Sequence, residues 1–276
     1  MKIFNKIKPL QEYLAKQQRP IGLVPTMGAL HQGHLSLIEQ SKKENSISVV
    51  SIFVNPLQFN DKNDFDKYPR IIDNDLKLLE EYKCDVVLAP SVDEMYPEPP
   101  QEHYDFGYLD QTLEGAYRPG HFEGVAIVVN RLFHIVKPDR AYFGKKDFQQ
   151  YVIIKELVKQ QNLPIEIVAV PIVRESSGLA MSSRNLRLNE QELKVAPEIY
   201  KALIKAKSLA YKKSINEIKQ IVINHLTQFP NYKIEYVEIV NEENLKPLND
   251  WNEGKAIILI ATWLGDVRLI DNMELS

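Results

Sequence analysis

His31 and His34 lie three residues apart where the sequence predicts the start of a helix. They follow an apolar run, Ile21 to Val24, and a bend that contains Gly28, and they precede the apolar-patterned segment Leu35 to Ile38. The first N–H groups of a helix have no intrahelical partner and carry the positive end of the helix dipole, so such a start binds anions. Imidazoles there can add charge-assisted hydrogen bonds to a phosphate. The pattern predicts a phosphate-bearing ligand, with an adenine nucleotide as the first candidate.

A metal site is the alternative interpretation of the same two histidines. Imidazoles three residues apart on one helical face can ligate one ion together. The turn offers no carboxylate or cysteine as a third ligand, which favours phosphate over metal. Gly33, between the histidines, suits close approach of the backbone to a ligand.

The composition is that of an ordinary globular chain of 276 residues, 44% hydrophobic and 26% charged, enough for one large domain or two modest ones. The formal net charge of -3 gives no general attraction to nucleic acid or an anionic membrane, and we expect neither as a partner. The single cysteine, Cys84, excludes an internal disulfide and is expected to pack in the interior. Because Met1 to Leu10 lacks the apolar region of a signal peptide, and no apolar run reaches membrane-spanning length, we expect a cytoplasmic protein.

Short β-rich runs alternate with helical patterns over about the first 170 residues. The runs are apolar throughout rather than alternating, which indicates strands buried on both faces of a parallel sheet. We therefore expect an α/β fold with a Rossmann-like, doubly wound parallel sheet in residues 1–175. The expected strands are Ile21 to Val24, Ile47 to Val54, Asp85 to Ala89, Arg140 to Phe143 and Ile165 to Val173. The expected helices are Leu35 to Lys43, Asn74 to Tyr82, Val125 to Val136 and Phe148 to Gln160.

The pattern changes after Val173, where a loop is expected from Arg174 to Asn185. Helical patterns then precede strand-like runs, which predicts a smaller α+β domain in residues 176–276. The helical segments run from Glu190 to Tyr211 and Ile215 to Leu226, and the strands are Lys233 to Val240, Ala256 to Leu264 and Val267 to Ile270.

Unusual polar segments follow four of the strands in the first domain. They are Thr26 to His34, Asn55 to Gln58, Gly144 to Asp147 and Arg174 to Arg184. Ligands of open α/β sheets bind at the carboxyl ends of the strands, so these segments are expected to meet in one crevice. Its cationic or protonatable side chains, which suit a polyphosphate, would be His31, His34, Lys146 and Arg184.

Two familiar nucleotide-binding signatures are absent. Gly28 and Gly33 have the spacing of the P-loop glycines, but His34 stands where the P-loop lysine would be. The first strand is not followed by a Gly-x-Gly-x-x-Gly fingerprint. A P-loop hydrolase and a dehydrogenase are therefore both disfavoured.

The segment Gly178 to Arg184 suggests a second phosphate contact. Ser182 and Ser183 offer hydroxyl donors, and Arg184 offers a positive charge for a departing diphosphate. A polar interdomain linker is the alternative interpretation of this segment, and composition leaves it open.

His31-Gln-Gly-His34 resembles the HxGH motif, and Met181-Ser-Ser-Arg184 the KMSKS-type loop, of nucleotidyltransferases that direct attack on the α-phosphate of ATP. From about residue 20 to 190 the chain resembles a narrower family, the pantothenate synthetases (pantoate–β-alanine ligases). The matching blocks are Pro25 to His31, Ser51 to Phe59, Tyr68 to Arg70, Arg118 to Phe122, Tyr142 to Asp147 and Gly178 to Asn185.

The resemblance implies a two-step ligase of pantothenate and coenzyme A biosynthesis. The carboxylate of (R)-pantoate would attack ATP, giving pantoyl adenylate and diphosphate, and the amine of β-alanine would then displace AMP to give pantothenate. A transfer between anions needs charge neutralisation and alignment more than a protein nucleophile. The resemblance also implies a homodimer, Mg²⁺ with the ATP, and a second domain that closes over the ATP site.

Site residues follow from the resemblance position by position. His34 would stabilise the phosphates in the transition state or donate a proton, with His31 assisting, and Lys146 and Arg184 would also be catalytic. Gln58 and Gln150 would bind pantoate, and Gln58 would also bind β-alanine. Asp147 is the residue that could help to position Mg²⁺. The ATP-binding residues would be Met27, Gly28, Ala29, Leu30, His31, Gln32, Gly33, His34, Gly144, Lys145, Lys146, Asp147, Val173, Met181, Ser182, Ser183 and Arg184.

The chain departs from the family pattern at Lys145, where an acidic residue is usual, and at Ser177, where aspartate is usual. Two other functions stay open: an adenylyltransferase of the same fold with a different acceptor, and a non-catalytic nucleotide-binding protein. A tRNA synthetase is disfavoured because no basic anticodon-binding region follows residue 190. The block Arg118 to Phe122 either serves the site or forms the turn before the next helix.

Overall fold

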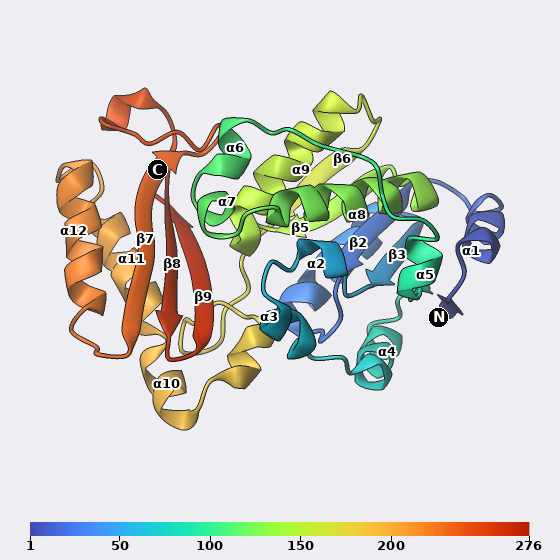
Figure 1. The fold of residues 1–276 in the computed structure, drawn as a ribbon, viewed down its shortest axis with the longest axis horizontal. Helices are drawn as coiled ribbons and strands as arrows, with labels where there is room; N and C mark the ends of the chain where they lie inside the picture. Colours follow the sequence, from blue (N-terminus) through green and yellow to red (C-terminus); the bar gives the residue numbers. More distant parts are fainter. Residues whose placement is uncertain (276) are drawn as a thin grey trace. The chain divides into compact units, whose positions relative to one another are not determined.

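The computed structural model describes residues 1–275, and its contacts divide the chain into two compact units (Figure 1). The first unit comprises Met1–Lys145 and Ile153–Pro171, and the second comprises Lys146–Val152 and the chain from Ile172 onward. The sequence predicts a single boundary at 175/176, whereas Lys146–Val152 groups with the second unit. One reason is a hydrogen bond from Asn272 Nδ2 to the Lys146 carbonyl oxygen, 3.0 Å long.

The first unit contains a six-stranded parallel sheet in the order β1-β4-β3-β2-β5-β6. From β2 the chain proceeds to β3 and β4 on one side and later to β5 and β6 on the other side, so the predicted Rossmann-like, doubly wound class is confirmed. The strands are β1 (Lys2–Phe4), β2 (Ile21–Thr26), β3 (Ile47–Ile52), β4 (Val86–Leu88), β5 (Arg140–Gly144) and β6 (Glu166–Val170).

The helices predicted for this region are present, with ends that differ by a few residues. Leu35 and Ile38 of α2 and Leu79 of α4 pack in one apolar core with Val50 and Val87 of the sheet, which explains the apolar character of those strands. The helices are α1 (Ile7–Leu14), α2 (Gln32–Glu44), η1 (Pro56–Gln58), α3 (Lys62–Asp66), α4 (Ile72–Glu81), α5 (Val92–Met95), α6 (Tyr108–Gln111), α7 (Glu114–Tyr117), α8 (His121–Val136), η2 (Lys145–Asp147) and α9 (Phe148–Gln160).

The sequence analysis missed β1 and α1. β1 has three residues, and its pairing with β4 places Ile3 opposite Val87 at the edge of the sheet. Ile3 is 48% exposed, so this short edge strand carries no pattern of burial that a sequence could reveal.

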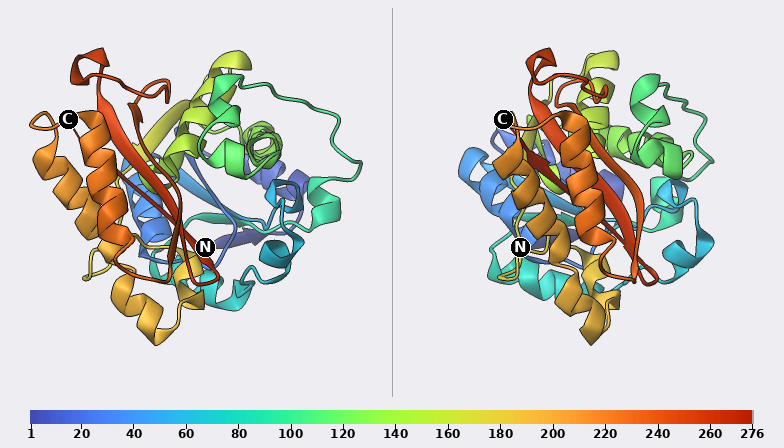
Figure 2. Two further views of the ribbon diagram at one scale, coloured as in Figure 1. Left: turned by 60° about the vertical axis from the view of Figure 1, so that its left-hand side comes forward. Right: turned by 90° about the vertical axis from the view of Figure 1, so that its left-hand side faces the viewer.

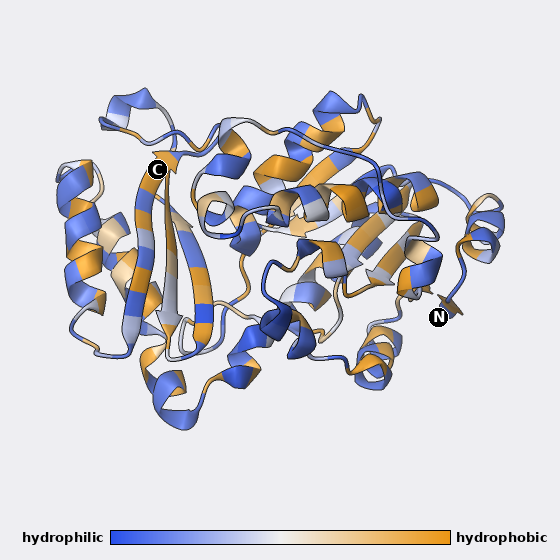
Figure 3. Cartoon of the chain, in the orientation of Figure 1, coloured by the Kyte–Doolittle hydropathy of each residue, from blue (hydrophilic) through white to orange (hydrophobic). Residues whose placement is uncertain are grey.

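The second unit contains an antiparallel sheet in the order β7-β8-β9, with α11 and α12 against one face (Figure 2). Figure 3 shows hydrophilic and hydrophobic residues alternating along β7, whereas β8 is buried over nearly its whole length. The elements are η3 (Ser183–Arg187), α10 (Glu190–Val195), α11 (Glu198–Leu209), α12 (Ile215–Leu226), β7 (Tyr232–Asn241), η4 (Trp251–Glu253), β8 (Ala256–Leu264) and β9 (Val267–Glu274).

Two predictions for the second unit need correction. The helical stretch expected from Glu190 to Tyr211 is two helices, because Pro197 between them has no N–H for a helical hydrogen bond. The last strand extends to Glu274 rather than ending at Ile270, since it pairs with β8 along that length.

Cys84 is 2% exposed, and burial raises the pKa of its thiol to about 11. A thiol that stays protonated at neutral pH is a poor nucleophile, which agrees with the predicted packing role. No helix in residues 1–275 is long and apolar enough to cross a membrane.

Gly124 of α8 fixes the distance between this helix and η1. A Cβ built on Gly124 would lie 2.2 Å from the Leu57 carbonyl oxygen, which belongs to the backbone and cannot rotate away. We expect Gly124→Ala to lower the free energy of unfolding by about 1–3 kcal/mol, the usual cost of overpacking. Urea denaturation would measure it. Gly144→Ala is the control, because no described heavy atom lies within 4 Å of its added Cβ, and an equal loss in both variants would contradict the prediction.

Candidate functional site

The parallel pairing of β2 with β3 and with β5 brings the carboxyl ends of these strands to one edge of the first unit's sheet. The segments that leave this edge carry many of the predicted site residues of the unit. They are the turn from β2 into α2, the η1 segment after β3, and Gly144 and Lys145 at the end of β5. The arrangement agrees with the expected position of a ligand site in an open α/β sheet.

The turn between β2 and α2 contains two successive residues with positive φ, Gly28 at 79° and Ala29 at 49°. The buried carboxylate of Asp75, on α4, holds this turn. Its Oδ2 accepts the Ala29 N–H at 2.9 Å, and its Oδ1 accepts the Leu30 N–H at 2.8 Å. A Cβ on Gly28 would lie 2.8 Å from Oδ2, so the close approach of the carboxylate requires glycine there.

Asp75 is a site residue that the sequence analysis missed. It is 1% exposed, and burial raises the pKa of its carboxyl above the usual value, although the Leu30 and Ala29 N–H groups partly oppose this shift. The turn that is predicted to bind ATP is therefore shaped by a carboxylate from another helix.

His31 and His34 cap the first turn of α2 in a reciprocal way. His31 Nδ1 accepts the Gly33 N–H at 3.1 Å, and His34 Nδ1 accepts the His31 N–H at 3.3 Å. The ring centroids are 4.1 Å apart. Because each Nδ1 is an acceptor, the proton of each neutral ring is on Nε2. The histidines therefore contribute to the folding of the helix start as well as to its predicted chemistry.

Gln58, predicted to bind pantoate and β-alanine, is buried and oriented by Asn55. Asn55 Nδ2 donates hydrogen bonds to Gln58 Oε1 at 3.1 Å and to the Gly124 carbonyl at 3.0 Å, while Asn55 Oδ1 accepts one from the Tyr96 hydroxyl at 3.0 Å. The Gln58 amide nitrogen lies 3.1 Å from Met27 Sδ. Because a thioether is a weak acceptor, this NH₂ group is suited to donate to a carboxylate or hydroxyl of a substrate.

The block Arg118 to Phe122 supports Gln58 rather than forming only a turn. His121 is buried, and its Nδ1 lies 2.8 Å from the Gln58 carbonyl oxygen. Arg118 Nη1 lies 3.1 Å from His121 Nε2. His121 therefore contacts the backbone of the segment that presents Gln58, and Arg118 acts on that segment through His121.

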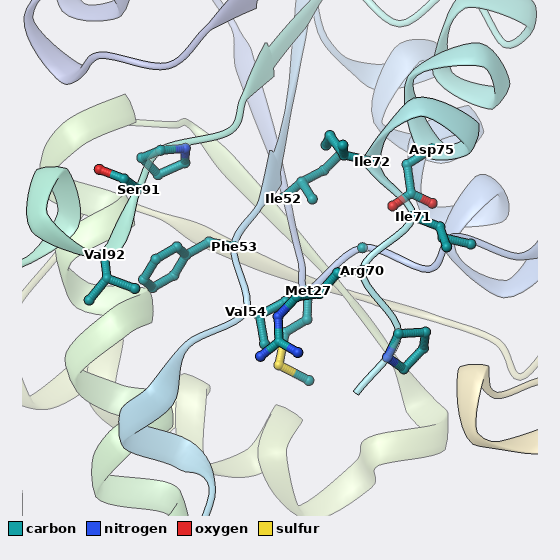
Figure 4. A pocket seen from close by; sticks show the side chains of 13 residues that line it. Met27, Ile52, Phe53, Val54, Arg70, Ile71, Ile72, Asp75, Ser91 and Val92 are labelled. Carbon is teal, nitrogen blue, oxygen red and sulfur yellow. The ribbon is translucent and has the colours of Figure 1, made fainter. Parts of the chain in front are cut away.

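A cavity of about 230 Å³ borders the turn on the side of β3 and β4 (Figure 4). Its lining is mostly apolar, with Met27 and Arg70 among the side chains that line it. Arg70 donates hydrogen bonds to the carbonyl oxygens of Tyr68 and Phe65, so this cation supports the loop before α4.

In the second unit, Lys146 and Asp147 lie in the η2 turn, and Gln150 lies in the first turn of α9. Lys146 Nζ is 3.6 Å from Asp147 Oδ1, with side-chain exposures of 18% and 50%. Gln150 is half-buried.

The segment Val173 to Arg184 is a folded loop rather than an extended linker. Arg174 and Ala180 form an antiparallel bridge, and the Met181 N–H donates to the Val173 carbonyl at 3.0 Å. Ser182 caps η3, where its Oγ accepts the Arg184 N–H at 3.3 Å. Met181, Ser182, Ser183 and Arg184 are all half-buried within the second unit.

The two departures from the family pattern lie in ordered positions. Ser177 Oγ accepts the Leu179 N–H at 3.4 Å, which is a turn contact that an aspartate could also make. Lys145 is half-buried at the end of β5. The loss of the acid at Ser177 therefore leaves the loop with an acceptor for this turn.

No group of three or more histidine, cysteine, aspartate or glutamate side chains within residues 1–275 has an arrangement that could hold a metal ion. A magnesium ion carried by phosphate needs fewer protein ligands, since it keeps several waters and takes one or two carboxylates. Asp147, half-exposed beside Lys146, is suited to such a contact.

Comparison with known proteins agrees with this geometry. The family described as Pantoate-beta-alanine ligase matches residues 2–274. A pantothenate synthetase of Bacteroides fragilis is 49% identical over 99% of both chains, and one of Fervidobacterium nodosum is 50% identical over 99% of this chain and 97% of that one.

Solved structures give the same result. A pantothenate synthetase from Thermus thermophilus superposes with a TM-score of 0.95 at 42% identity, covering 100% of this chain and 99% of that chain. The pantoate-beta-alanine ligase of Francisella tularensis, solved with βγ-ATP and β-alanine, superposes with a TM-score of 0.83 at 35% identity, covering 100% and 98%.

A doubly wound parallel sheet with histidines capping the helix after its central strand defines a class of α/β nucleotide-binding enzymes. Within that class, the chain belongs to the pantoate–β-alanine ligase family, whose sequence pattern covers all but its ends. It is therefore a ligase.

The raised pKa of Asp75 predicts how stability depends on pH. The ordinary pKa of an aspartate carboxyl is 3.8, and the pKa of Asp75 in the folded state is higher. Between these two values the unfolded state has lost the carboxyl proton while the folded state keeps it, so the stability that Asp75 contributes falls as pH rises through its raised pKa. We expect the unfolding free energy of the wild type, relative to Asp75→Asn, to decrease as pH rises from 4 to 7. Urea denaturation across this range would measure the difference. The exposed Asp73→Asn is the control for charge removal, and a rise with pH would contradict the assignment.

Proposed function

We propose that this chain condenses (R)-pantoate with β-alanine at the expense of ATP, releasing AMP and diphosphate, through a pantoyl adenylate. The observation that carries the proposal is the contact between Gln58 and Met27. It joins the residue proposed to hold the acid to the segment proposed to hold ATP, within one unit of the chain. The acid carboxylate would then lie beside the nucleotide that it attacks.

In the first step, a pantoate carboxylate oxygen attacks the α-phosphorus of ATP, a P–O bond forms, and the bond to diphosphate breaks. The Gln58 NH₂ group holds the pantoate without adding charge, and Gln150 is proposed as its second amide contact. The residues Met27 to His34 lie along the nucleotide, while Gly144 and Val173 contact the nucleoside through backbone groups. Positioning and neutralisation of charge account for the catalysis, since no protein nucleophile is required.

Diphosphate departure requires positive charge and hydrogen-bond donors at the β and γ phosphates. Lys146 and Arg184 supply the charge, and Ser182 and Ser183 supply hydroxyl donors. His31 and His34 act as neutral donors through Nε2, because their Nδ1 atoms accept backbone N–H groups. This detail favours transition-state hydrogen bonding by His34 over proton donation. When Mg²⁺ is bound with ATP it offsets phosphate charge, and Asp147 would contact it directly or through water.

In the second step, the β-alanine amine attacks the acyl carbon of the adenylate, an amide bond forms, and AMP leaves. The amine loses its proton as the C–N bond forms. AMP is a far better leaving group than the oxide of a free carboxylate, which explains why activation comes first. Gln58 also contacts β-alanine in this proposal. The active protein is proposed to be a cytoplasmic homodimer.

Diphosphate exchange into ATP tests this function. Purified protein with Mg²⁺ is expected to exchange labelled diphosphate into ATP only when pantoate is added, and to release AMP when β-alanine follows. Exchange supported by another acid would favour an adenylyltransferase with a different acceptor. ATP binding with no exchange under any acid would favour a non-catalytic nucleotide-binding protein.

His34 variants separate its two roles. We expect His34→Ala and His34→Glu both to lower pantoate-dependent exchange by at least a hundredfold, because neither side chain has an N–H donor; one such donor is worth about 10²–10³ in rate. Only His34→Ala should also lose about 0.5–2 kcal/mol of stability, since glutamate at this position can still accept the capped N–H. Exchange rates and thermal unfolding measure the two effects. Wild-type exchange by folded His34→Glu would contradict the catalytic role.

A further inference from the structure

Two neighbouring residues of β9, Asp271 and Asn272, each contact a different segment that carries proposed diphosphate ligands. Asp271 is bound to Arg174, which begins the folded loop that ends in Ser182, Ser183 and Arg184. Asn272 is bound to the backbone of Lys146. All of these contacts lie within the second unit. We call Asp271 and Asn272 the β9 anchor.

The contact with Arg174 is a buried, two-pronged ion pair. Arg174 Nη1 and Nη2 donate to the two carboxylate oxygens of Asp271 at 2.6 and 2.9 Å, and Asp271 is 4% exposed. The Arg174 guanidinium also lies 4.2 Å from the ring centroid of Tyr200 and donates to the Gly178 carbonyl at 3.1 Å. The guanidinium is therefore held in one orientation and cannot serve as a mobile phosphate ligand.

Gly178 is held by the same set of contacts. Its φ is 94°, and a Cβ built on it would lie 2.2 Å from the Tyr200 ring. The loop thus turns at a glycine that packs on Tyr200, and Arg174 stacks on the same ring. The path of the chain from Arg174 to Met181 is set by these contacts.

The contact with Lys146 involves the second anchor residue. Asn272 is 4% exposed, and its Nδ2 donates to the Lys146 carbonyl at 3.0 Å. The Asn272 N–H donates to Asp271 Oδ1 at 2.8 Å, so the two anchor residues also orient one another. Adjacent residues of β9 therefore hold both the η2 turn that contains Lys146 and the loop from Arg174 to Arg184.

We propose that the β9 anchor is a positioning device for the diphosphate end of ATP, fixing the distance between Lys146 and the Ser182–Arg184 loop. This inference rests on the proposed function, in which these residues hold the departing diphosphate. Asp271, Asn272 and Arg174 are positioning residues and touch no substrate. Phosphate contacts speed the reaction only if the groups that make them are already at the right distance from one another, so the separation between Lys146 and the Ser182–Arg184 loop must be set before ATP binds.

Asp271→Asn and Asn272→Ala test the anchor separately. Each is expected to raise the KM for ATP in the exchange reaction by tenfold or more, while the KM for pantoate changes less than twofold. Trypsin cleavage after Arg184 and Arg187 is expected to accelerate in Asp271→Asn and to slow when ATP is added. The proteolysis does not depend on turnover, so it reports on the loop even if the wild type proves to have another acceptor.

The matched control is Glu235→Gln. Glu235 lies on β7 and pairs with Arg268 of β9, the strand that carries the anchor. The Nη2–Oε2 distance is 2.6 Å and both side chains are 14% exposed. Through this pair, Glu235 contacts neither the Lys146 segment nor the loop from Arg174 to Arg184. It should lower the unfolding temperature without a selective change in the KM for ATP. Equal shifts of both KM values in Asp271→Asn, or the same ATP effect in Glu235→Gln, would overturn the inference. Absence of pantoate-dependent exchange in the wild type would instead overturn the proposed function.

Discussion

The parallel pairing of β2 with β5 is the constraint on which the site in the first unit depends. Gly22 pairs with Arg140 and Leu23 with Ala141, although the two strands are separated in the chain by β3, β4 and α8. After β2 the chain continues to β3 on one side of this pair, and after β5 it continues to β6 on the other side. No crossover connection therefore covers the segments that follow β2 and β5 at the edge of the sheet. A polar turn can occupy this edge because the strands that precede it are held in the sheet.

Within that edge, the backbone conformation is maintained by side chains rather than by regular hydrogen bonding. The turn of Gly28 and Ala29 has positive φ at both residues and would not persist alone. Asp75 offsets the energetic cost of this strained backbone by accepting hydrogen bonds from the adjacent N–H groups of Ala29 and Leu30. The histidine pair then stabilises the start of α2 with its Nδ1 atoms, which leaves the orientation of both rings determined before a nucleotide binds.

The sequence predicted the elements whose signal is local. α12 and β8 have the predicted limits, because a Ser214 capping box begins the helix and an unbroken apolar run forms the strand. Asp75 and Asp271 could not be recognised in the same way. Their partners lie 45 residues away at Leu30 and 97 residues away at Arg174, and a lone aspartate in a helix or strand is ordinarily a solvated residue. The predicted site residues were taken from motifs, whereas the residues that support their segments became visible only with the fold.

Buried carboxylates perform the same task in each unit, and physical reasoning explains why charge is used. Burial raises the pKa of both Asp75 and Asp271, so each carboxylate has a desolvation cost that an apolar side chain would avoid. An apolar side chain, however, could not accept the N–H groups of a strained turn or fix the plane of a guanidinium. The buried carboxylate lowers stability, but it defines a single geometry for the loop that it contacts. A reaction between anions needs its donors held at fixed positions, because donors that must reorganise would lose much of their effect on the developing charge. The cost of the two buried charges is therefore consistent with the chemistry proposed for the segments that they hold.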